Sequence, residues 1–162
     1  MKNSRQFVLI CGILALASFV RFHAAAVPKN TQALELSAGW NLIALEGVPL
    51  RMQEFLELRP MVYDEERHSY IMATEKTTFQ RGMAAWIYSP EARTIKIPLV
   101  SASTTLPPVQ PTDFGWTLAG AVDNTPPWLE QVTRPFFQWN MGKGFVPAET
   151  PEAKSGYWVK LK

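Results

Sequence analysis

The feature that most constrains this chain is a short pattern that occurs twice along its 162 residues. Residues 39–45 read Gly-Trp-Asn-Leu-Ile-Ala-Leu, and residues 115–121 read Gly-Trp-Thr-Leu-Ala-Gly-Ala. A second tryptophan closes each copy, within Ala-Ala-Trp-Ile-Tyr at 84–88 and within Gly-Tyr-Trp-Val-Lys at 156–160. Self-similarity at a nearly constant spacing is typical of a structural unit that is repeated along the chain.

Further landmarks lie between each opening and closing, in the same order. An Arg-Pro pair occurs at 59–60 and at 134–135, and an aromatic residue begins a short apolar run at 70–73 and at 145–148. We therefore predict a duplication within one chain. The predicted division is a first half (27–100), a connector rich in Pro, Ser and Thr (101–113) and a second half (114–162).

Most local signals in both halves are those of β-strands. The run 40–46 is rich in residues with high β-propensity, and 33–36 alternates between apolar and polar residues. Alternation also places Ile95, Ile97 and Leu99 on one strand face.

A turn is predicted in the middle of each half. The charged segment 64–68 separates two tyrosine-containing strands, and its counterpart at 140–144 carries glycines that suit positive φ. One short helix precedes each turn and ends before the Arg-Pro pair, since a residue ahead of proline disfavours helical angles. The second helix is expected to have Thr125 as its cap and Pro126 at its first position. The apolar helix faces would be Met52, Phe55 and Leu56 within 51–58, and Trp128, Leu129 and Val132.

The predicted fold is mainly β, with two tandem duplicated β-rich halves that contain one short helix each. All 13 prolines follow residue 26, which is about twice the usual share for a segment of this length and favours short strands and many turns. A half of roughly 60 residues is marginal as an independent core. We therefore expect the halves to pack as a single compact unit, like a sandwich or a barrel.

Residues 1–26 have the features of a secretory signal peptide. Lys2 and Arg5 precede an apolar run at 7–20, and 24–26 supplies three alanines for cleavage. An uncleaved anchor is the alternative, but this run spans only about 21 Å as a helix, against a hydrocarbon core of roughly 30 Å. We expect an exported protein in the periplasm, at the cell surface or in the medium, without a membrane span after cleavage.

Composition narrows the function further. At 47% hydrophobic and 19% charged residues, the chain is neither disordered nor a polytopic membrane protein. Cleavage after Ala26 removes three of the 16 basic residues, so that 14 acidic residues leave a net charge of −1. A near-neutral surface lacks the basic footprint of a nucleic-acid-binding protein.

The residues that usually carry catalysis or bind metals are scarce. Cys11 is the only cysteine and lies in the signal segment, where the bulky Ile10 before it argues against a lipoprotein motif. His68, the one histidine after residue 26, lies in a charged turn, which is a poor platform for a catalytic base. The acids at 64–66 lack the spaced pattern of a calcium loop. We predict no catalytic, cofactor or metal site; a glycan-active enzyme with paired distant carboxylates is the remaining enzymatic alternative.

Aromatic residues are the functional lead, because the chain has six tryptophans and four tyrosines. Trp40, Trp86, Trp116 and Trp158 occupy equivalent strand positions of the two halves and are expected in a shared core. Other aromatic side chains are expected to be partly exposed and to form a ligand or partner surface. These candidates are Tyr63, Tyr70, Trp128, Trp139 and Tyr157.

The opening at 39–42 and the closing Gly-Tyr-Trp-Val at 156–159 resemble repeats of exported bacterial and archaeal proteins. Thr117 replaces the Asn of the opening in the second half, and Ala84-Ala85 replace Gly-Tyr at the close of the first. The resemblance implies an accessory all-β module of an envelope or secreted protein, and it carries no catalytic residues.

Two functions follow. The first is a non-catalytic structural or interaction subunit that binds an envelope or extracellular protein, for which uncovered strand edges offer one docking mode. The second is a carbohydrate-binding module that uses exposed aromatic rings on a polysaccharide. The sequence leaves the oligomeric state open.

Overall fold

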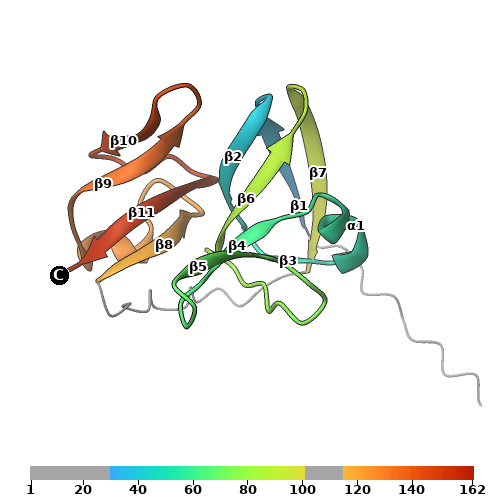
Figure 1. Ribbon diagram of the computed structural model, residues 1–162, viewed down its shortest axis with the longest axis horizontal. Coiled ribbons are helices and arrows are strands. Elements are labelled where there is room, and N and C mark those ends of the chain that lie inside the picture. Colours follow the sequence, from blue (N-terminus) through green and yellow to red (C-terminus); the bar gives the residue numbers. More distant parts are fainter. Residues whose placement is uncertain (1–29, 101–114) are drawn as a thin grey trace, which may run out of the picture.

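A computed structural model describes residues 30–100 and 115–162, and these are mainly β, in open antiparallel sheets (Figure 1). The predicted signal peptide and connector lie outside the described residues. The first half contains β1 (Asn30–Leu36), β2 (Gly39–Ala44), β3 (Val48–Pro49), α1 (Met52–Glu57), β4 (Met61–Asp64), β5 (Ser69–Met72), β6 (Ala84–Ser89) and β7 (Arg93–Val100). The second half contains β8 (Trp116–Ala121), the 3-10 helix η1 (Pro127–Glu130), β9 (Val132–Asn140), β10 (Gly144–Ala148) and β11 (Ser155–Leu161).

The strands form two sheets. One has the order β1-β7-β3, and the other has the order β10-β9-β11-β2-β6-β4-β5, with β8 paired to β11 beside this path. The larger sheet passes from one half to the other between β11 and β2, through the single pair Ser155 and Ile43. The two halves therefore lie side by side with little strand pairing between them (Figure 1).

The opening and closing strands of both halves pair in the same register. In the first half, the closing Trp86 on β6 lies opposite Leu42 on β2. In the second half, the closing Trp158 on β11 lies opposite Leu118 on β8. Each closing tryptophan is thus paired with the leucine two positions beyond the opening tryptophan.

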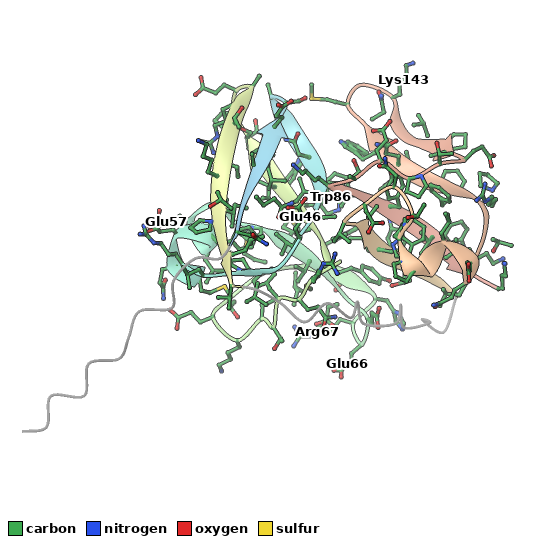
Figure 2. All side chains as sticks on the ribbon, turned by 180° about the vertical axis from the view of Figure 1, so that it is seen from behind. Glu46, Glu57, Glu66, Arg67, Trp86 and Lys143 are labelled. Atoms are coloured by element: carbon green, nitrogen blue, oxygen red, sulfur yellow. The ribbon has the colours of Figure 1, made fainter. Side chains whose placement is uncertain are left out.

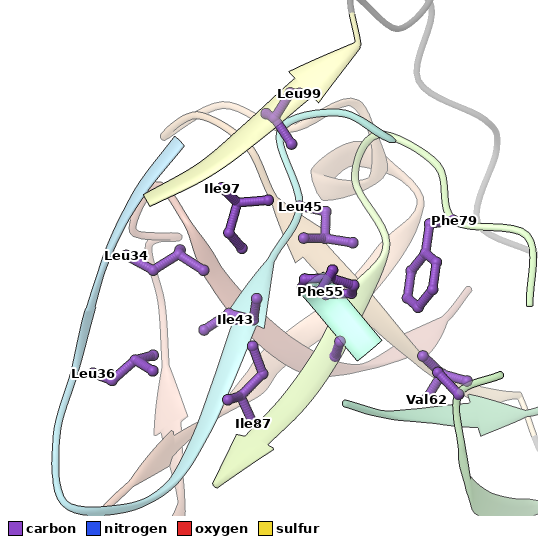
Figure 3. Packing of buried hydrophobic residues seen from close by; sticks show 12 residues of the cluster. Leu34, Leu36, Ile43, Leu45, Phe55, Val62, Phe79, Ile87, Ile97 and Leu99 are labelled. Atoms are coloured by element: carbon purple, nitrogen blue, oxygen red, sulfur yellow. The ribbon is translucent and has the colours of Figure 1, made fainter. Parts of the chain in front are cut away.

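The first half surrounds the larger core (Figure 3). Leu34 from β1 and Ile97 and Leu99 from β7 are buried there, together with Phe55 of α1. Ile95 is partly buried against the same cluster, so the predicted shared face of β7 is confirmed.

The second half has its own smaller core. Trp128 of η1, Phe136 of β9 and Tyr157 of β11 pack together, with centroids of their rings 5.2 to 5.8 Å apart. The indole N–H of Trp128 donates a hydrogen bond to the Gly120 carbonyl at 3.1 Å, which satisfies the one polar atom of this buried side chain.

A short helix forms at each predicted place, but the second differs from the prediction in three details. Helix α1 lies within 51–58, buries Phe55 and ends before the Arg-Pro pair. The predicted cap at Thr125 and first position at Pro126 were wrong, because η1 begins at Pro127 and has no side-chain cap hydrogen bond. The placement of Val132 on the helix was also wrong, since Val132 is the first residue of strand β9. Instead, the Thr125 N–H donates to Asp123 Oδ1 at 3.0 Å.

Both predicted turns are confirmed as hairpins. Strands β4 and β5 pair on either side of the charged turn, in which His68 adopts a φ of 49°. Strands β9 and β10 pair across the glycine-containing turn, where Gly142 and Gly144 have positive φ.

Candidate functional site

Aromatic side chains of the two halves meet where the halves face each other. Trp86 on β6 is buried and lies between them, as Figure 2 shows. Its ring centroid is 4.9 Å from that of Trp139 and 6.0 Å from that of Phe145, both in edge-to-face geometry. Trp139 and Phe145 belong to the β9–β10 hairpin, so a closing tryptophan of the first half contacts a hairpin of the second.

The closing tryptophan of the second half contacts a hairpin of the first half with nearly the same geometry. The centroid of Trp158 on β11 is 5.0 Å from that of Tyr63 and 6.3 Å from that of Tyr70, which form a ring pair on the β4–β5 hairpin. Edge-to-face pairs stabilise by about 0.5–1.5 kcal/mol each beyond the area that they bury. Reciprocal aromatic contacts therefore hold the halves together.

Backbone hydrogen bonds between the halves also occur as a matched pair. The Gly120 N–H donates to the Gly82 carbonyl, and the Ala44 N–H donates to the Lys154 carbonyl, both at 2.9 Å. The two acceptor residues have positive φ, at 81° for Gly82 and 68° for Lys154.

Small residues permit this close approach. A Cβ at Gly120 would lie 2.6 Å from the Gly82 carbonyl oxygen and 2.7 Å from the Ala44 Cβ. A Cβ at Gly156 would lie 3.1 Å from the Ala84 Cβ. The facing strands therefore require glycine at positions where a larger side chain would separate the halves.

Three of the five predicted surface residues lie in this aromatic cluster, and two do not. Tyr63, Tyr70 and Trp139 are half-buried there. The expected exposure of Trp128 and Tyr157 was wrong, because both are buried in the second core. Alternation along β11 turns Tyr157 into that core while the preceding and following residues face the first half.

The four tryptophans expected in a shared core differ in how far they are buried. Trp86 is buried, as expected, and Trp116 and Trp158 are half-buried. Trp40 contradicts the expectation, since 41% of its surface is exposed. It lies at the start of β2, where its ring contacts Trp86 and the exposed Tyr88.

Four rings of the second half line a shallow apolar depression of about 340 Å³. The lining residues are Trp116, Phe137, Phe145 and Trp158, and we call this site the apolar depression. Sequence reasoning missed Phe137 and Phe145 as site residues. The available signal was alternation along β9 and β10, which places them on the same face as Trp139.

A second, more polar cleft of about 490 Å³ lies on the β1–β2 side of the junction between the halves. We call it the Trp40 cleft; the lining residues that define it chemically are Glu35, Trp40, Gln138, Trp139, Glu152 and Lys154. The Trp139 indole N–H donates to the Trp40 carbonyl at 2.9 Å, and Gln138 Nε2 donates to Glu152 Oε2 at 3.1 Å.

The charged turn borders a third and larger cleft, of about 850 Å³. There the Thr117 hydroxyl donates to Glu65 Oε1 at 3.0 Å, while Asp64 accepts the Arg67 N–H at 3.0 Å. Among residues 30–100 and 115–162, no group of three or more His, Cys, Asp or Glu side chains is placed to hold a metal ion.

Burial perturbs two tyrosine hydroxyls. It raises the pKa of Tyr70, and the nearby indoles of Trp86 and Trp158 partly offset this effect. The Tyr70 Oη is buried without a hydrogen-bond partner of standard geometry among the described residues. Burial also raises the pKa of Tyr157, whose Oη accepts the Glu152 N–H at 2.6 Å.

No helix in the described part of the chain is long and apolar enough to cross a membrane. Comparison with models of known protein families, with curated proteins and with solved structures found no match.

Proposed function

We propose that this chain is an exported, non-catalytic β module that docks onto a protein of the cell envelope or the extracellular space through the apolar depression. One observation carries the proposal: four aromatic rings surround an open depression to which the described residues contribute no polar lining. Protein interfaces characteristically place their strongest contacts where an apolar anchor of one partner fills such a desolvated pocket.

The depression fits an apolar side chain of a partner protein. Phe145 at its edge is 39% exposed, and Lys160 lies exposed beside Trp116, to which it is paired across the strands. Other large apolar side chains are exposed elsewhere on the described surface, among them Trp40, Tyr88 and Met141.

The proposal includes an internal duplication whose halves pack as one compact unit. Three observations support it: the common register of the opening and closing strands, the reciprocal ring contacts at 4.9 and 5.0 Å, and the matched backbone hydrogen bonds at 2.9 Å. The sequence resemblance to exported accessory repeats supports the same assignment, and the signal segment at 1–26 supports export.

Carbohydrate binding is the second candidate function. A saccharide site needs polar groups beside an aromatic ring, because sugar hydroxyls must exchange their hydrogen bonds with water for hydrogen bonds with the protein. The apolar depression does not provide them among the described residues, whereas the Trp40 cleft does.

Site-specific photo-cross-linking in the source cells tests the docking proposal. A photoreactive phenylalanine derivative at Phe145 is expected to capture one envelope or extracellular protein in stoichiometric yield, and the same group at the exposed Lys96 on β7 is expected to capture none. Trp116→Ala, which removes one side of the depression, should lower the yield at Phe145 at least fivefold while the far-UV spectrum stays unchanged. Equal capture from Phe145 and Lys96, or recovery of the monomer alone, would contradict docking at the depression.

A further inference from the structure

We infer that the Trp40 cleft binds a neutral oligosaccharide. This site is separate from the apolar depression, and the inference does not rest on docking to a protein. Its volume of about 490 Å³ falls within the range of about 300–1,000 Å³ that is typical of small-ligand pockets. The site lies between elements of both halves, which is a common place for ligand sites.

Two indoles form an ordered aromatic surface at this cleft. The Trp40 side chain is 41% exposed, and its ring centroid lies 6.3 Å from Trp86 and 5.4 Å from Tyr88. The hydrogen bond from Trp139 Nε1 to the Trp40 carbonyl joins the two indole-bearing strands. The Trp40 ring is held by its contacts with Trp86 and Tyr88, so it loses little side-chain entropy when it stacks on the C–H face of a pyranose.

The Glu152 carboxylate and the Gln138 amide also belong to residues that line this cleft. Gln138 uses one N–H for its hydrogen bond to Glu152, which leaves its carbonyl oxygen and second N–H as further hydrogen-bonding groups. Glu152 likewise has a second carboxylate oxygen. Neighbouring hydroxyls of a sugar ring act as both donors and acceptors, and this pair of side chains supplies both functions.

The backbone on the polar side of the cleft is also fixed. The Glu152 N–H donates to the buried Tyr157 hydroxyl at 2.6 Å. Lys154 donates its N–H to Ala121 at 2.7 Å and accepts the Ala44 N–H at 2.9 Å. The backbone that carries Glu152 and Lys154 is therefore ordered before a ligand binds, which reduces part of the ordering cost of binding.

The charges at the cleft favour a neutral ligand over an anionic one. Glu35 and Glu152 contribute two carboxylates, against the single ammonium of Lys154. The Trp40 cleft is lined both by these two indoles and by the pair Gln138 and Glu152. The larger cleft beside the charged turn is lined by neither indole.

Calorimetric titration of the full exported chain with cellohexaose, chitohexaose and laminarihexaose tests this inference. At least one of these neutral probes is expected to bind and to change tryptophan fluorescence. Trp40→Ala and Gln138→Ala should each weaken its binding at least tenfold, whereas Trp116→Ala, the matched change at the opening tryptophan of the second half, should alter it less than twofold.

Three results would overturn the assignment. The first is that none of the three sugars binds at millimolar concentration, and the second is an equal loss of binding in the Trp40 and Trp116 variants. The third is preferential binding of a lysine-rich peptide, measured in parallel. Thermal unfolding of each variant confirms that the fold is retained. Cross-linking from Phe145 should be unaffected by Gln138→Ala, which separates failure of this inference from failure of protein docking.

Discussion

At Gly120 the two halves approach so closely that a side chain does not fit. Its Cβ would meet the Gly82 carbonyl oxygen at 2.6 Å and the Ala44 Cβ at 2.7 Å, and a backbone atom cannot move aside like the end of a flexible side chain. We expect Gly120→Ala to lower the free energy of unfolding by about 2–3 kcal/mol through overpacking. Urea denaturation measures this change.

Gly142→Ala is the control for that substitution. Nothing lies within 4 Å of a Cβ at Gly142, so only its φ of +88° opposes a side chain, at about 1 kcal/mol. A loss at Gly120 no larger than the loss at Gly142 would contradict the close approach of the halves.

The Tyr70 hydroxyl makes stability depend on pH in the alkaline range. Its pKa is raised above the ordinary value of 10.0, so the folded state keeps the neutral form at a pH where the unfolded chain ionises. The resulting stability is fully present below pH 10 and is lost as pH rises through the folded-state pKa. Tyr70→Phe should therefore reduce the loss of stability between pH 9.5 and pH 11, measured by denaturation at each pH.

The same variant makes a prediction at neutral pH. Because the buried Tyr70 Oη lacks a hydrogen-bond partner of standard geometry, its removal should change stability by less than about 0.5 kcal/mol or be stabilising. Tyr157→Phe instead removes the bond from the Glu152 N–H and should cost about 1–2 kcal/mol. Equal effects of the two variants at pH 7 would contradict this distinction.

At the scale of elements, the β9–β10 hairpin depends on Trp86 for its position. Trp86→Ala removes the ring that contacts Trp139 and Phe145, and we expect a loss of about 3–5 kcal/mol. Amide hydrogen exchange should accelerate more in β9 and β10 than in α1, because the hairpin loses a local contact in addition to the stability of the whole unit. The exposed Tyr88 on the same strand face provides the control, and Tyr88→Ala should leave exchange in the hairpin unchanged.

Sequence reasoning was most successful at this scale, because strands and turns follow from local patterns. Alternation predicted the buried face of β7, and turn composition predicted both hairpins. It failed for Tyr157 and Trp40, whose exposure depends on which part of each sheet face the other half covers. The two clefts and the apolar depression could not be predicted either, since they arise from packing between segments far apart in sequence.

At the scale of the whole molecule, the central claim is that the two halves form one folding unit. The halves are connected by one strand-pair bridge, by two matched backbone hydrogen bonds and by the reciprocal aromatic contacts. Since each half is marginal alone, loss of these contacts should destabilise both cores together.

Differential scanning calorimetry of the chain tests this claim most directly. A single unfolding transition is expected, with a calorimetric enthalpy equal to the van't Hoff enthalpy, as for a two-state domain. Trp86→Ala should lower the midpoint of that transition as a whole. Two separate transitions in the unmodified chain, or a shift confined to one of them in the variant, would contradict the claim.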